Sequence, residues 1–332
     1  MSTRPIAVLG AGSWGTALAI RLAVNNNHVR LWGHDPDFMA LLARERCNSE
    51  FLPDVAFPDS LLIESDLATV LGNVRDILLV VPSHAFREVL EQAVPHLSGP
   101  ARIAWATKGL EHGSGKFMAT VLEEVAGSRY PSAVVSGPTF ALEVARGLPT
   151  ALTVASNNPV FANDMAARLH GGPMRVYTSD DLLGVQLGGT VKNVLAIASG
   201  ITDGLQLGAN SRAALITRGL AEIIRLGDAM GARRETLMGL SGVGDLILTC
   251  TDDLSRNRRL GLALGRGSTL DIAVREIGQV VEGFNTAREV VKLARQYRVE
   301  MPISEQVFKV LHEGLTPEAA VHNLLARDIR SE

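Results

Sequence analysis

The sequence predicts an α/β fold, in which a doubly wound parallel sheet domain is followed by an all-α domain. Three observations predict it. An apolar run at 6–9 leads directly into the glycine-rich turn GAGSWG at 10–15. Short apolar runs then alternate with helical segments as far as about residue 180, which implies right-handed crossovers and parallel pairing. Beyond that point apolar residues recur at helical spacing, and strand-like alternation is nearly absent. For a chain of 332 residues we therefore expect two domains, over 1–185 and 186–332.

The strands of the first domain are predicted from short apolar runs, several of them continuous, as is typical of strands covered on both faces. In chain order, the expected strands are 6–9, 29–32, 77–81, 103–107, 133–136, 151–155 and 175–177. The helices between them are expected at 16–24, 38–45, 66–71, 84–96, 116–126 and 159–169. The pattern leaves open whether the later strands pair parallel or antiparallel.

The helices of the second domain are predicted from apolar residues three and four positions apart. The first series runs from Val191 to Leu205, and the second runs from Ala213 to Ile224, with Gly231 at the C-terminal cap position. Further helices are expected at 245–249, 256–264, 286–297 and 317–326.

Composition excludes several classes of function. A net charge of −3 argues against a general nucleic-acid binder. Apolar stretches are interrupted well before the roughly 18 residues that a membrane span needs, so we expect no membrane span. The first residues run directly into a predicted strand, so we also expect no signal peptide. Cys47 and Cys250 form no C-x-x-C pair, so we expect a reducing cytoplasm. The eight histidines lack metal-ligand spacing, and we expect no metal site.

The glycine-rich turn has a specific physical role for each glycine. We expect Gly10 to allow the tight turn, Gly12 to let the backbone approach a pyrophosphate, and Gly15 to let the helix pack close to the strand. The phosphates would then sit on N–H groups at the helix N-terminus. The alternative is a purely structural turn, but the position between a strand and a helix favours a Rossmann-type dinucleotide site.

Lys192 stands in LGGTVKNVLAIASGI, a helix that is otherwise almost uncharged. One interpretation is a lysine that snorkels from a core helix to solvent. However, the scarcity of other charges predicts substantial burial, and we expect Gly188 and Gly189 to leave space for a ligand one turn earlier. A desolvated ammonium has a lowered pKa and can transfer a proton near neutral pH. The pattern alone leaves the catalytic and structural interpretations open.

Asp245 lies in SGVGDLILTC, at the start of a predicted helix. On spacing alone the favoured interpretation is an N-cap. The flanking glycines Gly242 and Gly244 also permit the carboxylate to turn away from the helix and hold a lysine ammonium.

The start of another predicted helix is a candidate for anion binding. Ser255 is a suitable N-cap, and Arg256 and Asn257 follow in the first turn, where N–H groups and a guanidinium suit a phosphate dianion. The alternative is a solvated basic face, since Arg258, Arg259 and Arg266 follow.

Lys108 ends a predicted strand, and Gly137 and Thr139 follow another. The carboxyl ends of parallel strands are where open α/β sheets bind ligands. The alternatives are an ordinary strand-exit lysine and a plain turn.

Taken together and in this order, these segments resemble the bacterial soluble NAD(P)-dependent glycerol-3-phosphate dehydrogenases. The resemblance covers essentially the whole chain, and many motifs in the correct order are more specific than any single one. The segments that carry it are GAGSWGTALA, HVRLWGHD, VVPSH, ATKGLE, SGPTFALEVA, GGTVKNVLAIASGITDGL, SRAALITRGLAE, GLSGVGDLILTCT, SRNRRLG and VVEGFNT.

The resemblance implies reversible reduction of dihydroxyacetone phosphate to sn-glycerol 3-phosphate by NADH or NADPH, which supplies glycerophospholipid synthesis. It implies that Lys192 is the catalytic proton-transfer residue and that Asp245 orients it. The substrate-binding residues that it implies are Lys108, Gly137, Thr139, Lys192, Asp245, Ser255, Arg256 and Asn257. The cofactor-binding residues that it implies, beside Gly10, Gly12 and Gly15, are Ser13, Trp14, His34, Lys108, Ala141, Arg256, Val280 and Glu282.

Two other functions are compatible with a Rossmann-type domain followed by a helical domain, and the cofactor can be NAD or NADP. A β-hydroxyacid or 2-ketopantoate dehydrogenase also uses a helix lysine, but the Ser255–Asn257 cluster argues for a phosphorylated substrate. A non-enzymatic NADPH sensor would have no use for Lys192 and Asp245. An acidic Asp35 at the end of the second strand favours NAD, whereas the preceding His34 suits a 2′-phosphate, and we lean slightly to NADPH. A homodimer is compatible with the sequence.

Overall fold

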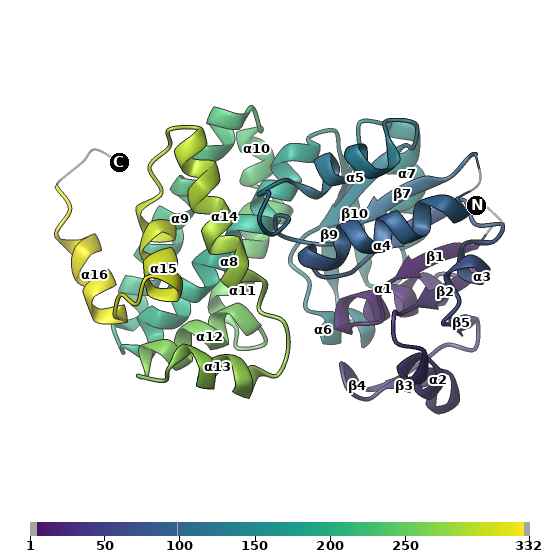
Figure 1. Ribbon diagram of the computed structural model, residues 1–332, viewed down its shortest axis with the longest axis horizontal. Helices are drawn as coiled ribbons and strands as arrows, with labels where there is room; N and C mark the ends of the chain where they lie inside the picture. The colour runs from purple at the N-terminus through teal and green to yellow at the C-terminus, as the bar shows by residue number, and fades with distance from the viewer. Residues whose placement is uncertain (1–4, 98, 329–332) are drawn as a thin grey trace. The chain divides into compact units, whose positions relative to one another are not determined.

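The computed structural model describes residues 5–97 and 99–328. The chain divides into two compact units (Figure 1). The first comprises the chain up to Glu111 together with Lys116–Val185, and the second comprises His112–Gly115 and the chain from Gln186 onward. The boundary near 185 thus coincides with the change from alternating strands and helices to helices alone.

The first unit is built on an eight-stranded sheet whose order is β10-β9-β8-β7-β6-β1-β2-β5. Its strands are β1 (Ile6–Leu9), β2 (Val29–Trp32), β5 (Leu61–Glu64), β6 (Asp76–Leu79), β7 (Arg102–Trp105), β8 (Ser132–Ser136), β9 (Thr150–Ala155) and β10 (Met174–Ser179). A separate short ribbon pairs β3 (Cys47–Asn48) with β4 (Leu52–Ala56).

The pairing directions settle the question that the sequence left open. From β5 to β8 every neighbouring pair is parallel; for example, Ile6 lies opposite Val29 on one side and Asp76 on the other. The direction then reverses, because β9 runs antiparallel to β8 and parallel to β10. The carboxyl ends of β1, β6, β7 and β8 therefore lie at one edge, where ligands bind in open sheets.

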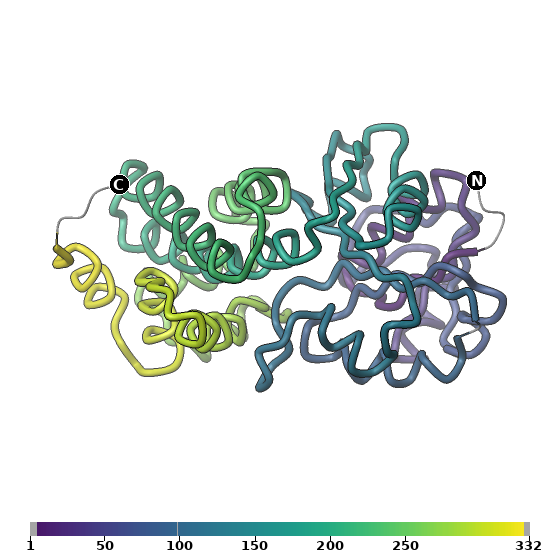
Figure 2. Tube along the Cα trace, turned by 90° about the horizontal axis from the view of Figure 1, so that it is seen from above, coloured from purple at the N-terminus to yellow at the C-terminus, as the bar shows by residue number. Residues whose placement is uncertain are grey.

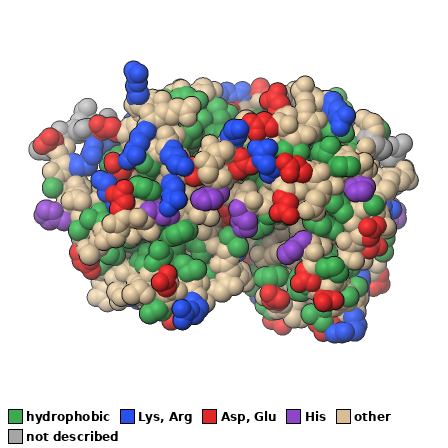
Figure 3. Space-filling view, in the orientation of Figure 1, with side chains coloured by type: hydrophobic (Ala, Val, Ile, Leu, Met, Phe, Trp, Pro, Cys, Tyr) green, Lys and Arg blue, Asp and Glu red, His purple; other side chains and the backbone are tan. Residues whose placement is uncertain are grey.

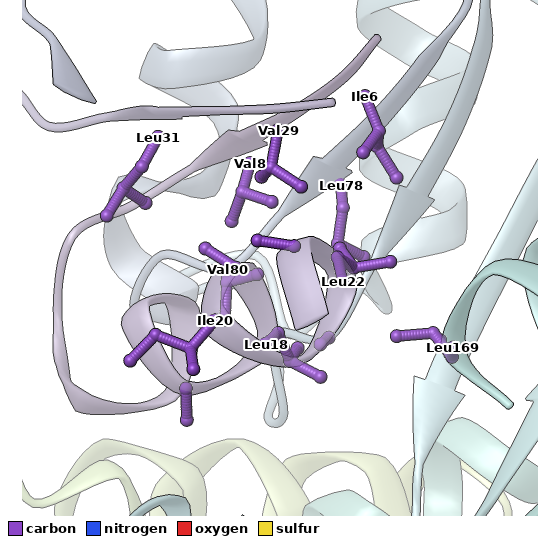
Figure 4. Close-up of a cluster of buried hydrophobic side chains, with 14 of the residues drawn as sticks. Ile6, Val8, Leu18, Ile20, Leu22, Val29, Leu31, Leu78, Val80 and Leu169 are labelled. Carbon is purple, nitrogen blue, oxygen red and sulfur yellow. The ribbon is translucent and has the colours of Figure 1, made fainter. Parts of the chain in front are cut away.

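Two hydrophobic clusters sandwich this sheet. Helices α1 (Ser13–Val24), α6 (Ala141–Ala145) and α7 (Pro159–Leu169) contribute to the cluster on one face, together with residues of α2 (Pro36–Glu45). In Figure 4, Leu78 of β6 lies beside Leu22 of α1, and both belong to the same cluster as Val8 and Val29. Helices α3 (Leu67–Leu71), α4 (Phe86–Ala93) and α5 (Met118–Ala126) contribute to the cluster on the other face. Burial of both faces explains why these strands read as continuous apolar runs.

The predicted strands are all present, with ends shifted by at most two residues. The sequence prediction missed β3, β4, β5 and α6. These elements are short, and β4 contains Pro53 and the positive-φ residue Asp54, both of which are typical of turns. A five-residue helix such as α6 shows too few turns for a helical period to be recognised.

The second unit is helical, and beyond Ser179 the described residues contain no strand (Figure 2). Its elements are α8 (Leu182–Gly204), α9 (Gly208–Met230), α10 (Arg234–Leu237), the π-helical turn η3 (Leu240–Gly244), α11 (Asp245–Thr251), α12 (Arg256–Gly265), α13 (Leu270–Ile277), α14 (Glu282–Gln296), α15 (Pro302–His312) and α16 (Pro317–Leu325). Gly231 ends α9 in the left-handed conformation, as predicted, whereas α10, α13 and α15 were not predicted.

Helix α8 forms the centre of the second unit. It is long and apolar enough to span a membrane by length and composition, but 89% of its most apolar window is buried within the protein, as in a core helix. Glycines allow α12 to pack directly on it: a Cβ at Gly200 would lie 2.1 Å from the Arg258 carbonyl oxygen, and one at Gly261 would lie 2.0 Å from that of Ile197. This close packing brings the start of α12 beside the middle of α8.

Candidate active site

The glycine-rich turn between β1 and α1 has the geometry that the sequence predicted. Gly10 has a φ of +124°, and a Cβ there would lie 2.3 Å from the Val80 carbonyl oxygen. A Cβ at Gly15 would lie 1.9 Å from the Gly10 carbonyl oxygen, so only glycine lets the helix approach this closely. Around Gly12, in contrast, a Cβ would meet nothing within 4 Å. The backbone at Gly12 is therefore open to a pyrophosphate at the N-terminus of α1.

Directly after this turn, one polar atom lacks a partner within the protein. The indole Nε1 of Trp14, in the first turn of α1, is buried and has no hydrogen-bond partner in the protein. A buried indole N–H normally has a partner, so this atom is a ready donor to a bound molecule.

At the end of β2, Asp35 serves as the N-cap of α2. Its Oδ1 accepts the N–H groups of Asp37 at 3.0 Å and Phe38 at 3.1 Å. The side chain of His34, directly before it, is exposed. One carboxylate oxygen of Asp35 is thus engaged within the protein, while His34 is accessible.

Lys108, Gly137 and Thr139 lie together at the carboxyl edge of the sheet, beyond β7 and β8. The Lys108 ammonium and the Thr139 hydroxyl each donate to the Gly137 carbonyl oxygen, at 3.1 Å. Gly137 has a φ of +154°, and a Cβ there would lie 2.8 Å from the Leu152 Cα. Ala141 begins α6 just after this turn. The structure therefore brings together the strand-end residues that the sequence singled out.

Lys192 is buried in the second unit, with 6% of its surface exposed. Its ammonium, on α8, donates to the Asp245 carboxylate and to the Thr249 hydroxyl, the latter at 2.9 Å. The Thr249 hydroxyl in turn donates to the Asp245 carbonyl oxygen at 2.6 Å. The ammonium is thus neutralised and oriented by one face of α11, so the interpretation of Lys192 as a lysine that snorkels to solvent is wrong.

The structure also corrects two expectations about the neighbours of Lys192. Asp245 is not an N-cap: Gly244 holds that position, and Asp245 turns its carboxylate to Lys192. Gly188 does not leave space for a ligand, because a Cβ there would lie 2.4 Å from the Ser241 carbonyl oxygen. Its function is to let α8 pack against η3.

Sequence reasoning missed Thr249. The signal was present, since residues four apart on a helix share a face, and Thr249 lies four positions after Asp245. Cys250, the next residue, is buried, and this burial raises the pKa of its thiol to about 12.

The start of α12 forms the second polar group of this unit. The Ser255 hydroxyl accepts the Arg258 N–H at 3.2 Å, which confirms it as the N-cap. Asn257 donates to the Asn193 side-chain oxygen at 3.0 Å and accepts the Gly283 N–H at 2.8 Å. Since Asn193 follows Lys192, this asparagine pair ties the start of α12 to the lysine-bearing turn of α8. Asn193 was not singled out from the sequence.

The arginines of α12 have separate roles. Burial lowers the pKa of the Arg256 guanidinium, whose Nη1 lies 3.4 Å from the Gln279 side-chain oxygen. Arg258 is buried and paired with Asp203 at 2.6 Å and Asp253 at 2.9 Å, so it is structural. Arg259 and Arg266 are exposed. The cluster is therefore not one continuous basic face.

Two further residues that the resemblance assigns to cofactor binding belong to the second unit. Val280 is exposed, and Glu282 begins α14. In the face drawn in Figure 3, Lys and Arg side chains are interspersed with Asp and Glu. Among the described residues, no group of three or more His, Cys, Asp or Glu side chains is arranged to hold a metal ion.

Comparison with known proteins identifies the family. The sequence model of the NAD-dependent glycerol-3-phosphate dehydrogenase N-terminus matches residues 5–162, and that of its C-terminus matches residues 181–322. The chain belongs to this family. A glycerol-3-phosphate dehydrogenase (NAD(P)+) from Thioalkalivibrio sulfidiphilus is 60% identical over 332 residues, which is the full length of both chains. One from Shewanella baltica is 56% identical over 98% of this chain and 97% of its own.

Solved structures of glycerol-3-phosphate dehydrogenases agree with this membership. The enzyme from Coxiella burnetii has a TM-score of 0.95 at 50% identity, covering 98% of this chain and 99% of its own. The Saccharomyces cerevisiae enzyme has a TM-score of 0.83 at 25% identity, covering 97% and 99%. A ketopantoate reductase from Ralstonia eutropha has a TM-score of 0.60 at 18% identity, which shows a shared fold alone. The family membership favours the phosphorylated substrate over the ketopantoate alternative.

Proposed function

We propose that this chain reduces dihydroxyacetone phosphate to sn-glycerol 3-phosphate with NADH or NADPH, and that Lys192 donates the proton. The chain is an NAD(P)-dependent glycerol-3-phosphate dehydrogenase over its full length. The observation that supports Lys192 is its burial in a helical core together with a carboxylate and a hydroxyl that hold its ammonium. A buried, oriented acid is what proton transfer to a developing alkoxide requires.

The residues of this chain would act as follows. The nicotinamide, when bound, supplies the hydride to the ketone carbon. Lys192 gives a proton to the carbonyl oxygen as negative charge grows there, and Asp245 and Thr249 keep the amine aimed through the transfer. Lys108 places a second positive charge near that oxygen, which stabilises the transition state more than the neutral ketone.

Phosphate recognition is proposed for the start of α12. Ser255 caps this ten-residue helix, whose N-terminus carries a partial positive charge. The Arg256 guanidinium and the Asn257 amide lie in its first turn. Binding the phosphate away from the reacting carbon would fix the geometry of the ketone, together with Gly137 and Thr139 from the strand-end turn.

Cofactor binding is proposed for the residues implied by the resemblance. The glycine-rich turn and Trp14 would hold the pyrophosphate region, as their open backbone and unpartnered indole N–H support. The other proposed contacts are Ser13, His34, Lys108, Ala141, Arg256, Val280 and Glu282. Because Asp35 is engaged as an N-cap and His34 is exposed, we propose a modest preference for NADPH. We also propose a cytoplasmic location, and a homodimer as the form to be tested by light scattering.

The decisive experiment is to mix the purified protein with dihydroxyacetone phosphate and follow the absorbance of NADPH and, separately, of NADH. Substrate-dependent oxidation is expected with both, and the ratio of rates tests the proposed preference. Tight cofactor binding without oxidation would overturn the proposal in favour of another substrate or a sensor.

A further inference from the structure

The chain that follows Lys108 closes into a small hairpin over residues 110–117. Leu110 and Phe117 form an antiparallel bridge, and the Glu111 N–H donates to the Lys116 carbonyl oxygen at 2.9 Å. The tip contains Gly113 and Gly115, with φ values of +86° and +69°. The segment is therefore a defined turn, and only Gly109 separates it from Lys108.

The base of this hairpin is fixed within the first unit by charged side chains. Arg87 of α4 donates to both carboxylate oxygens of Glu111, at 2.6 and 3.1 Å, and to Glu124 of α5 at 2.7 Å. Lys116, on the other strand of the hairpin, also pairs with Glu124. These ion pairs link the base of the hairpin to α4 and α5.

The tip of the hairpin, His112–Gly115, belongs to the second unit. Its anchor is Glu289 in the middle of α14, whose side chain is 0% exposed. Glu289 Oε1 accepts the Gly113 N–H at 3.2 Å and lies 3.9 Å from His112 Nδ1. A Cβ at Gly115 would lie 3.1 Å from Glu289 Oε2, so the tip packs closely on this carboxylate. Lys292, one turn later, pairs with Glu289 at 3.1 Å.

We propose that Glu289 is a positioning residue for Lys108. It does not act on substrate itself; by accepting the Gly113 N–H it holds the tip of the hairpin. The held hairpin restrains the backbone at Lys108, whose ammonium also donates to the Gly137 carbonyl oxygen. This inference rests on the proposed function, because it assigns Lys108 to the reacting oxygen. It adds a residue of α14, far from Lys108 in sequence, to those on which turnover depends.

The test compares two substitutions with a matched control. Glu289→Met keeps the approximate volume but removes the acceptor, whereas Glu289→Gln retains an oxygen that can accept the Gly113 N–H. The control is Glu222 of α9, another buried carboxylate, which accepts the N–H groups of Ile303 at 2.5 Å and Ser304 at 3.2 Å. Glu222→Met removes an equivalent buried anchor that has no link to the hairpin.

We expect Glu289→Met to lower kcat for dihydroxyacetone phosphate by about 10- to 100-fold, since misplacement by about 1 Å has effects of this size. Glu289→Gln should restore kcat to within roughly threefold of the wild type. Glu222→Met should lower Tm while leaving kcat unchanged. In a Lys108→Ala background, Glu289→Met should change kcat by less than about threefold, because the two residues act through the same group.

Hydrogen exchange supplies a readout that does not depend on activity. Amides of residues 110–117 should exchange faster in Glu289→Met than in the wild type or Glu222→Met. Unchanged exchange in this segment, or an equal loss of kcat with and without Lys108, would overturn the proposal. If the wild type itself does not turn over dihydroxyacetone phosphate, the proposed function fails, and the exchange result still decides whether Glu289 holds the hairpin.

Discussion

The two lysines of the candidate site are held in different ways. Lys192 is buried on a long core helix, and side chains one turn apart on α11 hold its ammonium. Lys108 is half-buried at a strand end, where its ammonium donates to the Gly137 carbonyl oxygen. The first ammonium donates to a carboxylate and a hydroxyl, whereas the second donates to a backbone carbonyl oxygen. This difference is one reason for proposing Lys192 as the proton donor and Lys108 as a residue that stabilises charge.

The largest expected effect comes from Lys192→Ala. Without the proton donor, turnover should be abolished, with a loss of about 10⁴-fold or more in kcat. NADPH affinity, measured by fluorescence titration, should stay within about twofold of the wild type, because no proposed cofactor contact is removed. Near-normal turnover would show that Lys192 is structural after all.

Lys108→Ala should have the next largest effect, and it tests directly whether Lys108 and Lys192 have different roles. Removing one stabilising charge is expected to lower kcat by about 10²-fold, and NADPH should bind more weakly because Lys108 is also proposed to contact it. Steady-state kinetics measure kcat, and the same fluorescence titration measures the affinity for NADPH. A loss as complete as that of Lys192→Ala would mean that the two lysines share one role.

Arg256→Ala tests whether substrate binding can be separated from chemistry. Loss of a charged hydrogen bond to the phosphate should raise KM for dihydroxyacetone phosphate by about 10- to 100-fold, with a smaller change in kcat. Arg259→Ala, on the exposed side of the same helix, is the matched control and should leave KM unchanged. An unchanged KM in Arg256→Ala would show that the substrate phosphate does not bind at the start of α12.

The smallest effect concerns stability, at a buried carboxyl group outside the candidate site. Burial is the main cause that raises the pKa of Glu222 to about 7, from about 4.5 in the unfolded chain. The folded protein therefore holds a proton that the unfolded chain releases, and this contribution is full below about pH 4.5 and is lost as pH rises through 7. Its size is a few kcal/mol at most.

Thermal melts of the wild type and Glu222→Gln at several pH values measure this contribution. The Tm of Glu222→Gln relative to the wild type should rise between pH 5 and 8. A difference in Tm between the two proteins that stays constant with pH would contradict the titration assigned to Glu222. The substitution should leave kcat unchanged at every pH.

The fold could be predicted largely because its signals are local. The apolar run before Gly10 and the run at β2 mark strands buried on both faces, and both were placed with the correct bounds. The reversal at β9 could not be predicted, because Val154 is buried and apolar whichever direction its strand takes. Local patterns determine which segments are strands, while pairing direction depends on tertiary contacts.

The candidate site shows the same limit. Lys192 and Asp245 each stood out, but they are 53 positions apart in the sequence, and nothing between them indicates that they meet. For Asp245, helix-cap chemistry was the stronger local signal, and the partner supplied by α8 overrode it. Residues such as Asn193 and Glu289 have no local signature, since their contacts lie on other elements. Motifs can therefore nominate residues, but only packing shows what each of them contacts.

The high pKa of the Cys250 thiol has a practical consequence. Only thiolates react readily with alkylating reagents, so Cys250 should be inert at neutral pH, whereas Cys47 is only partly buried. A maleimide dye is then expected to attach once per chain, at Cys47 on the sheet unit. Cys47 is thus a natural attachment point for a fluorophore, distant in sequence from Lys192. A change in the emission of the attached dye on addition of NADPH would report cofactor binding without an engineered cysteine.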